Sequence, residues 1–261
     1  MLEMDASQFQ RVIPLFRQIE HSIAIVFSVL EGNSPGRVFV DKLDQPSCAF
    51  LFPEGTFYYI AGDEKNDAFC HSVHQLLFEK LLPDADEKEI ILFAFNDAWR
   101  VYLDNLLKEN GAIRIYRKMF DFNADRYAEF CKNRKGIPAG MCLRPMGPEL
   151  AERYPQFQAV VDPGSKRFGY CLVNGEEIVS ECSSIFVGNG EAEIDIHTAE
   201  AYQGRGYALL VASALIDECQ ERGLRPNWAC WPERQASLAL AKKLGFEENP
   251  DVPAHLWAEE M

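Results

Sequence analysis

The stretch YQGRGYALLV, residues 202–211, places two glycines and an arginine directly before an apolar, helix-forming run. The residues before it, 191–198, alternate polar and apolar side chains, which predicts a strand. Gly204 and Gly206 can adopt positive φ and leave the main chain uncovered. A helix N-terminus presents unpaired N–H groups and a partial positive charge, so this unit predicts an anion site suited to a diphosphate. The alternative is a turn with no ligand.

Two other nucleotide-binding loops do not fit this turn. A Walker-type loop needs a lysine after its last glycine, and the turn has none. A dinucleotide-binding fingerprint needs a third glycine where this chain has Leu209. The anion site is therefore expected in a different fold.

The strands before the turn predict that fold. Asn-Gly in VNGE and the glycines of VGNGEA separate alternating runs, which predicts two hairpins and three antiparallel strands. The second half then reads as strand, helix, three strands, helix, strand, helix and strand. We expect an α+β domain, or an α/β layered one, around one central mixed and mostly antiparallel sheet.

The first half has a similar order but no glycine turn of this kind. Residues 7–31 read as one helix, followed by three short strands, a helix, a strand, a helix and a strand. A basic stretch with Gly136 and Pro138 follows, and we interpret it as a linker. We predict an N-terminal α+β accessory domain at 1–125 and a second domain at 126–261. The first is either unrelated to the second or a degenerate repeat of it.

The charge, apolar runs and cysteine spacing of the 261-residue chain argue against several functions. The net charge of −14 argues against a nucleic-acid surface. No run of 18 apolar residues and no leader pattern is present, so neither a membrane span nor secretion is expected. The eight cysteines are scattered without Cys-x-x-Cys or cysteine–histidine spacing, so we expect no metal site and a reducing cytoplasmic location.

At the glycine turn the sequence resembles the GNAT superfamily of N-acetyltransferases. Gln203–Ala208 matches its Gln/Arg-x-x-Gly-x-Gly/Ala signature, and RQASLALAKKLGF, residues 234–246, matches its later helix. Arg234 stands in place of the family's Asn, and Ala241 in place of its Tyr. The resemblance covers about residues 137–261. Within the superfamily, the second half is most similar to bacterial acetyltransferases of the zwittermicin A resistance type.

The resemblance implies acetyl-CoA as co-substrate and no metal. It implies that the diphosphate sits on the glycine loop, that the pantetheine arm runs along the strand before it, and that Ser237 lies near the pantetheine end. The implied cofactor-binding residues are Ile196, His197, Thr198, Gln203, Gly204, Arg205, Gly206, Tyr207, Ala208 and Ser237. A serine exposed on the helix surface is the alternative for Ser237.

Acetyl transfer to an amine needs a base, because the amine is mostly protonated at neutral pH. Glu193 and Asp195 share one face of the strand beside the turn, and paired carboxylates raise one another's pKa, so we predict one of them as the base. They can instead be solvated charges that attract a cationic substrate, and a bulge in the strand would change which one faces the thioester. His197 is a further candidate base. Ala241 leaves the tyrosine acid of the family without a counterpart.

The sequence therefore predicts an acetyl-CoA-dependent N-acetyltransferase that acts on the amine of a small molecule. Two alternatives remain: a non-catalytic acyl-CoA-binding sensor or interaction module, and a protein or peptide N-acetyltransferase. The sequence predicts no nucleic-acid or membrane partner and leaves the acceptor and the oligomeric state open.

Overall fold

The computed structural model describes residues 1–17, 19, 21, 23–94 and 96–259. It divides into two compact units: unit 1 is Met1–Arg117 with Asp251–Met261, and unit 2 is Lys118–Pro250. Two long strands, β6 (Ile113–Phe122) and β12 (Phe246–Ala258), each contribute residues to both units. The predicted boundary near residue 125 falls inside unit 2, just after β6. The division into 1–125 and 126–261 as functional domains stays a prediction.

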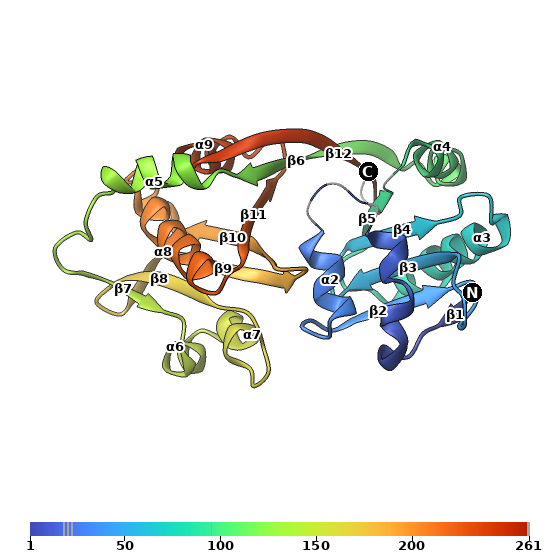
Figure 1. Cartoon of the computed structure of the whole chain (residues 1–261), viewed down its shortest axis with the longest axis horizontal. Coiled ribbons are helices and arrows are strands. Elements are labelled where there is room, and N and C mark those ends of the chain that lie inside the picture. Colours follow the sequence, from blue (N-terminus) through green and yellow to red (C-terminus); the bar gives the residue numbers. More distant parts are fainter. Residues whose placement is uncertain (18, 20, 22, 95, 260–261) are drawn as a thin grey trace. The chain divides into compact units, whose positions relative to one another are not determined.

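Unit 1 contains a mixed sheet in the order β1-β2-β3-β4-β5-β12 (Figure 1). Only β4 and β5 are parallel; every other neighbouring pair is antiparallel. The strands are β1 (Leu2–Glu3), β2 (Gly36–Val40), β3 (Cys48–Pro53), β4 (Phe57–Gly62), β5 (Glu89–Ala94) and the end of β12. All six residues of β3 are buried, so this strand reads as a continuous apolar run rather than an alternating one.

The helices of unit 1 include α3 (Asp67–Gln75), which follows β4, and α4 (Asp97–Leu106), which follows β5. Phe69 of α3 and Trp99 of α4 pack with strand residues such as Ile60 in one buried cluster. The predicted helix 7–31 is wrong as a single element. In its place are η1 (Ala6–Arg11), α1 (Ile13–Phe16) and α2 (Ala24–Leu30). The remaining helical segments are η2 (Leu76–Leu81), η3 (Leu82–Asp84) and η4 (Lys108–Asn110).

The sheet strands of unit 2 are also mixed in direction and follow the order β6-β11-β10-β9-β8-β7. Here β10 and β11 form the parallel pair, and the others are antiparallel. The strands are β7 (Met141–Pro145), β8 (Gly169–Asn174), β9 (Glu177–Gly188), β10 (Glu191–Thr198) and β11 (Arg225–Cys230). The predicted mixed, mostly antiparallel sheet flanked by helices is confirmed, as is the predicted order of strands and helices in this half.

The two predicted hairpins are present, and the backbone explains their sequences. Gly175 between β8 and β9 has φ 61°, and Asn189 and Gly190 between β9 and β10 have φ 55° and 73°. At residues 189–190 two successive positive φ values give a turn whose twist matches the flanking strands, and Asn-Gly is the pair best able to adopt it. In the turn between β8 and β9 only Gly175 has positive φ, which is the turn that needs glycine at its first central position.

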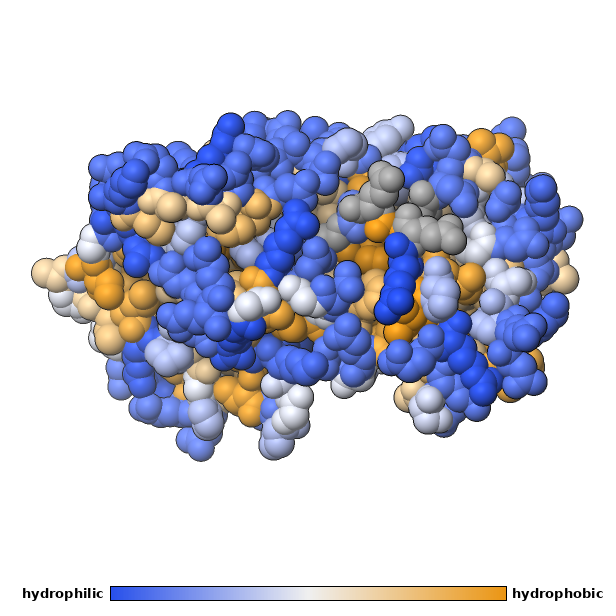
Figure 2. Space-filling model, viewed as in Figure 1, coloured by the Kyte–Doolittle hydropathy of each residue, from blue (hydrophilic) through white to orange (hydrophobic). Residues whose placement is uncertain are grey.

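Helices cover both faces of the unit 2 sheet. The helix α8 (Tyr207–Glu221) lies across one face (Figure 1), where Val211 and Leu215 share a buried cluster with Cys182 of β9. On the other face α6 (Pro148–Arg153), η5 (Pro155–Phe157) and α7 (Gln158–Val161) pack near Cys171 and Val173 of β8. Hydrophilic side chains cover most of the face seen in Figure 2, in keeping with the high net charge.

The predicted linker is partly helical. Residues Ala124–Lys132 form α5, capped by the Asn123 side chain, which accepts a hydrogen bond from the Arg126 amide. The Tyr127 hydroxyl donates to Asp217 of α8 at 2.6 Å, and Arg134 contacts the same carboxylate at 2.6 Å. This segment is therefore bound to α8 rather than solvated along its length.

Candidate functional site

The two parallel strands of unit 2, β10 and β11, are paired over only three residues and then separate. Glu191, Ala192 and Glu193 of β10 pair with residues 225–227 of β11. From Ile194 onward β10 pairs only with β9 in the part of the chain that is described, while β11 continues by pairing with β6. Residues 194–198 therefore have no strand neighbour on their β11 side, and this main chain is available to an extended ligand.

A bulge lies where the two strands separate. The register between β10 and β9 shifts between Glu193 and Ile194, which leaves Ile185 of β9 as the extra residue. Bulges re-aim side chains and increase local twist, and they are common next to active sites. The two candidate bases lie on either side of the shift, so their surroundings differ.

The glycine turn links β10 to α8 with the backbone predicted from the sequence. Gly204 has φ +74° and Gly206, the N-cap of α8, has φ +85°. A Cβ atom added at either position would meet no protein atom within 4 Å. Gly206 has no side chain to cap the helix, and no other described side chain caps it. The first amides of α8 therefore face open space, as an anion site requires.

A cavity of about 640 Å³ lies along the turn, the end of β10 and one face of α9 (Gln235–Lys243). It is lined by all of the predicted cofactor-binding residues except Arg205: Ile196, His197, Thr198, Gln203, Gly204, Gly206, Tyr207, Ala208 and Ser237. The structure thus brings together residues that are up to 41 positions apart, from Ile196 to Ser237.

The charges around the cavity are of one sign. None of its lining residues is acidic, although the chain carries 40 Asp and Glu against 26 Lys and Arg. Arg234 and Lys243 both line it, and the sequence analysis did not single them out as ligands. In the described part of the chain neither side chain has an ion-pair partner. A cationic pocket without carboxylates in an acidic protein favours an anionic ligand.

Arg205 is the one predicted cofactor-binding residue that does not line the cavity. Its guanidinium donates to the carbonyl of Ala201 at 3.0 Å and lies 5.4 Å from the centre of the Tyr202 ring. The side chain is therefore turned back onto the short helix η6 (Glu200–Tyr202), away from the cavity wall.

Ser237 is half-buried on the cavity wall. Its hydroxyl oxygen accepts a hydrogen bond from the indole N–H of Trp228 at 3.1 Å. A hydroxyl that accepts one bond can still donate its own proton, so Ser237 can serve a ligand carbonyl while it stays held by Trp228.

The two candidate carboxylates of β10 differ sharply in exposure. Glu193 is 3% exposed, and its Oε2 accepts a hydrogen bond from the Asn227 side chain of β11. Asp195, beyond the bulge, is exposed and lies opposite Ser183 of β9. Asp195 is thus the carboxylate that solvent reaches, whereas Glu193 is part of the packed seam between the strands.

Glu181 of β9 is a further titratable group that the sequence analysis missed. It lies opposite His197 in the β9–β10 register and is half-buried. Burial raises the pKa of Glu181, Asp195 raises it further, and His197 opposes that rise. Only the register identifies this neighbour, because the alternation of β9 alone does not say which residue of β10 it faces.

Ala241 of α9 is fully buried in the cluster that contains Leu244 and Phe246. No hydroxyl is available at this position, where the family motif has tyrosine.

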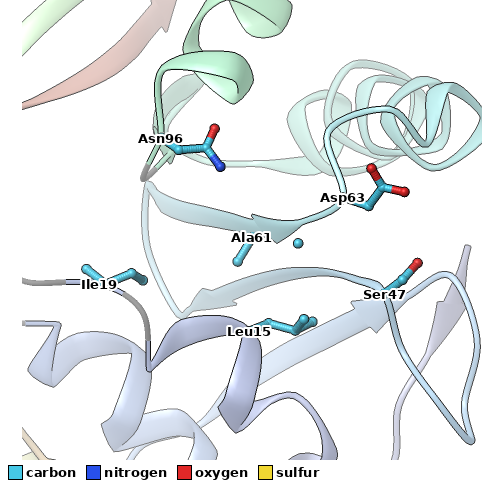
Figure 3. Close-up of a pocket in the computed structure, with 7 residues that line it drawn as sticks. Leu15, Ile19, Ser47, Ala61, Asp63 and Asn96 are labelled. Carbon is cyan, nitrogen blue, oxygen red and sulfur yellow. The ribbon is translucent and has the colours of Figure 1, made fainter.

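Unit 1 has a cavity of its own, of about 420 Å³, at the carboxyl ends of β4 and β5 (Figure 3). Leu15, Ile19 and Ala61 are apolar lining residues. The polar side chains are already engaged: the Ser47 hydroxyl donates to Asp41, the Asp63 carboxylate accepts from the Lys65 amide, and the Asn96 side chain accepts from the Trp99 amide. This cavity offers no charge arrangement comparable to that of unit 2.

The described residues contain neither a cluster suited to a metal ion nor a membrane-spanning helix. Among residues 1–17, 19, 21, 23–94 and 96–259, no group of three or more His, Cys, Asp or Glu side chains is arranged to hold a metal ion. No helix within these residues is both long and apolar enough to cross a membrane.

Comparisons with known proteins agree with the geometry. The sequence model of the GNAT acetyltransferase family matches residues 13–254, and so extends well before the region 137–261 in which the signature motifs lie. The chain is 32% identical over 231 residues to YdfB of Bacillus subtilis (strain 168), an uncharacterized N-acetyltransferase, with 85% of each chain covered.

Two solved structures share the fold over nearly the whole chain. A GCN5-related N-acetyltransferase-like protein from Streptococcus suis 89/1591 has a TM-score of 0.67 at 24% identity and covers 97% of this chain and 99% of its own. A tandem GNAT protein from the clavulanic acid biosynthesis pathway has a TM-score of 0.65 at 12% identity, with 97% and 95% covered. The chain belongs to the GNAT acetyltransferase family and is an acyltransferase.

Proposed function

We propose that the unit 2 cavity binds acetyl-CoA and that the chain transfers the acetyl group to an amine of a small molecule. The observation that carries the proposal is the cavity's charge: an uncapped helix N-terminus, two open glycines and two unpaired cations, with no carboxylate on the wall. The diphosphate of the cofactor fits the amides of residues 204–208. Its pantetheine arm fits beside Ile196–Thr198, where β10 lacks a neighbour.

An acyl-CoA held there supplies the thioester carbonyl that the amine attacks. The chain must accept the proton of the attacking amine. Asp195 is the better candidate for the base, because it is exposed and lies beyond the separation of β10 and β11. Glu193 already accepts a hydrogen bond from Asn227, which orients it and reduces its access to a substrate. Such a base contributes about 10²–10⁴-fold to rate.

A non-catalytic acyl-CoA-binding role is the second candidate, because the alanine at position 241 leaves no general acid there. The thiolate can leave without one, since the pKa of a thiol is only about 8.5.

The test combines titration calorimetry with CoA and a thiol-release assay with acetyl-CoA and a library of amines and peptides. We expect CoA binding and thiol release with at least one small amine. CoA binding without release for any amine would support the non-catalytic role, and release only with peptides would replace the small-molecule acceptor by a peptide. No binding of CoA would overturn the proposal.

A further inference from the structure

Arg234 and Arg205 differ from most arginines of unit 2, because neither forms an ion pair within the described chain. Six others form ion pairs with a carboxylate: Arg126 with Glu247, Arg134 with Asp217, Arg144 with Glu149, Arg153 with Glu176, Arg222 with Glu218 and Arg225 with Asp121. Arg234 is exposed, lines the cavity and has no partner within the described chain. The Arg205 guanidinium at least donates to the Ala201 carbonyl, whereas the Arg234 guanidinium has neither an ion pair nor a hydrogen bond within the described residues.

The topology places Arg234 at the same edge of the sheet as the glycine turn. β10 and β11 are parallel, α8 follows the end of β10, and α9 follows the end of β11. Both helices therefore begin at the carboxyl edge of these strands. Arg234 is the residue just before α9, and Gly206 is the residue just before α8. The cavity wall includes both.

Arg234 is also distant from Lys243, the second cation that lines the cavity. Lys243 is the last residue of α9, and nine residues of helix rise about 13 Å between the two ends. The backbones of the two residues therefore lie at opposite ends of α9. The planar guanidinium of an arginine donates in a fork that fits two phosphate oxygens, which an ammonium group cannot match.

We propose that Arg234 binds a phosphate group of the cofactor, supplies the side-chain charge that Arg205 does not bring to the cavity, and makes the site selective for CoA thioesters over unphosphorylated pantetheine thioesters. The inference rests on the proposed function. It assigns to this chain a contact that the family motif, with Asn at this position, does not contain.

The experiment measures the dissociation constants of CoA, dephospho-CoA and acetyl-pantetheine by titration calorimetry at one fixed ionic strength. The proteins are the wild type, Arg234→Gln, Arg234→Lys and, as the matched control, Arg205→Gln. We expect Arg234→Gln to weaken CoA binding by about 10- to 100-fold, the range of a lost charge-assisted hydrogen bond. Arg234→Lys should recover part of that loss. Arg205→Gln should change CoA affinity by less than about threefold, and acetyl-pantetheine should bind all four proteins equally.

The affinity for dephospho-CoA shows whether Arg234 contacts the 3′-phosphate or the diphosphate of CoA. If Arg234→Gln weakens CoA but not dephospho-CoA, the contact is the 3′-phosphate; if it weakens both, the contact is the diphosphate, and either result supports the inference. Equal CoA affinity in wild type and Arg234→Gln, or equal losses for all three ligands, would overturn it. If the wild type binds none of the ligands, the proposed function itself fails. Melting temperatures of the variants check that the fold is kept.

Discussion

The turn after β4 in unit 1 and the turn after β10 in unit 2 occupy the same place in two similar topologies. Each follows a strand of a parallel pair and leads into a helix. In unit 1 the Asn66 side chain caps α3 by accepting from the Phe69 amide at 3.1 Å. In unit 2 Gly206 leaves the start of α8 uncapped. One turn satisfies its own amides, and the other leaves them for a ligand.

The two turns also differ in the space around their glycines and in the charge of the nearby side chains. A Cβ on Gly62 of unit 1 would lie 2.0 Å from the carbonyl oxygen of Ser47, whereas Gly204 and Gly206 face open space. The groove between α3 and α4 of unit 1 is lined by one basic side chain, Lys65, and three acidic ones, Glu64, Asp67 and Asp97, while the unit 2 cavity has no acidic lining residue. The strand orders of the two units are similar, and we expect the anion site to depend on a few residues at the turn.

The largest effect is expected on the reaction rate. β10 carries three carboxylates, Glu191, Glu193 and Asp195, and β4 carries none, so Asp195→Asn removes the one exposed carboxylate by which β10 differs from β4. We expect kcat to fall by about 10²–10⁴-fold because the amine loses its base, with CoA affinity unchanged. Glu193→Gln is the comparison variant in the same thiol-release assay. A full rate in Asp195→Asn together with a large loss in Glu193→Gln would reassign the base.

Closing the unit 2 turn should abolish cofactor binding. Gly206→Val puts a side chain into the space that the diphosphate needs, and we expect CoA affinity to fall at least about 100-fold, the loss of two or more charge-assisted hydrogen bonds. Gly164→Val is the matched control, because Gly164 also has positive φ (+88°) and open surroundings but does not line the cavity. Calorimetry and melting curves of both variants separate strain from ligand contact. Equal CoA affinity in Gly206→Val and the wild type would show that the turn holds no phosphate.

The packed glycine of unit 1 should matter for stability instead. Gly62→Ala forces a Cβ against backbone at φ +107°, so we expect a loss of about 3 kcal/mol or more in the free energy of unfolding. Gly204→Ala, at φ +74° with no atom near its Cβ, should cost only about 1–2 kcal/mol. Urea unfolding of both variants measures the difference. Equal losses would mean that the two turns are not packed differently.

The smallest expected effect is on the free energy of unfolding, whose pH dependence includes a contribution from His255 of unit 1. His255 is 3% exposed, and its Nε2 lies 2.8 Å from an oxygen of Asp104, which Arg114 also contacts. Burial lowers the pKa of His255 below 6.5, and the Asp104 carboxylate opposes this change. The unfolded chain therefore binds this proton more readily than the folded one. The corresponding stability is complete above about pH 6.5 and is lost as the pH falls below that value.

His255→Gln keeps a donor for Asp104 but cannot be protonated. Its unfolding free energy should therefore fall less steeply than that of the wild type between pH 6.5 and 5, as measured by urea unfolding at each pH. Parallel curves for the two proteins would contradict this assignment. CoA affinity of the variant should equal that of the wild type, because His255 does not line the unit 2 cavity.

The sequence predicted well those features that depend on the backbone conformation of a few neighbouring residues. The strand Glu191–Thr198 has its predicted bounds, and the positive φ of Gly204, Gly206 and Gly190 follows from residue type. The single helix predicted for residues 7–31 failed because all seven residues of α2 are buried, so no polar face marks where the helix begins or ends.

The features that the sequence analysis missed depend on contacts between residues that are far apart in the sequence. The linker prediction overlooked α5. Tyr127 of α5 and Arg134, just after this helix, both contact Asp217, more than 80 residues later. Glu181 became a candidate only through its register with His197, and Arg234 only through the absence of an acidic neighbour in the described structure. Spacing along a chain contains none of this information.

A crystal structure of the protein grown with CoA tests the central claim most directly. We predict one CoA per chain, with its diphosphate against the amides of residues 204–208, its pantetheine arm beside Ile196–Thr198, and nothing bound in the acidic groove of unit 1. A coenzyme bound in that groove, or bound in unit 2 with its diphosphate away from the glycine turn, would contradict the account.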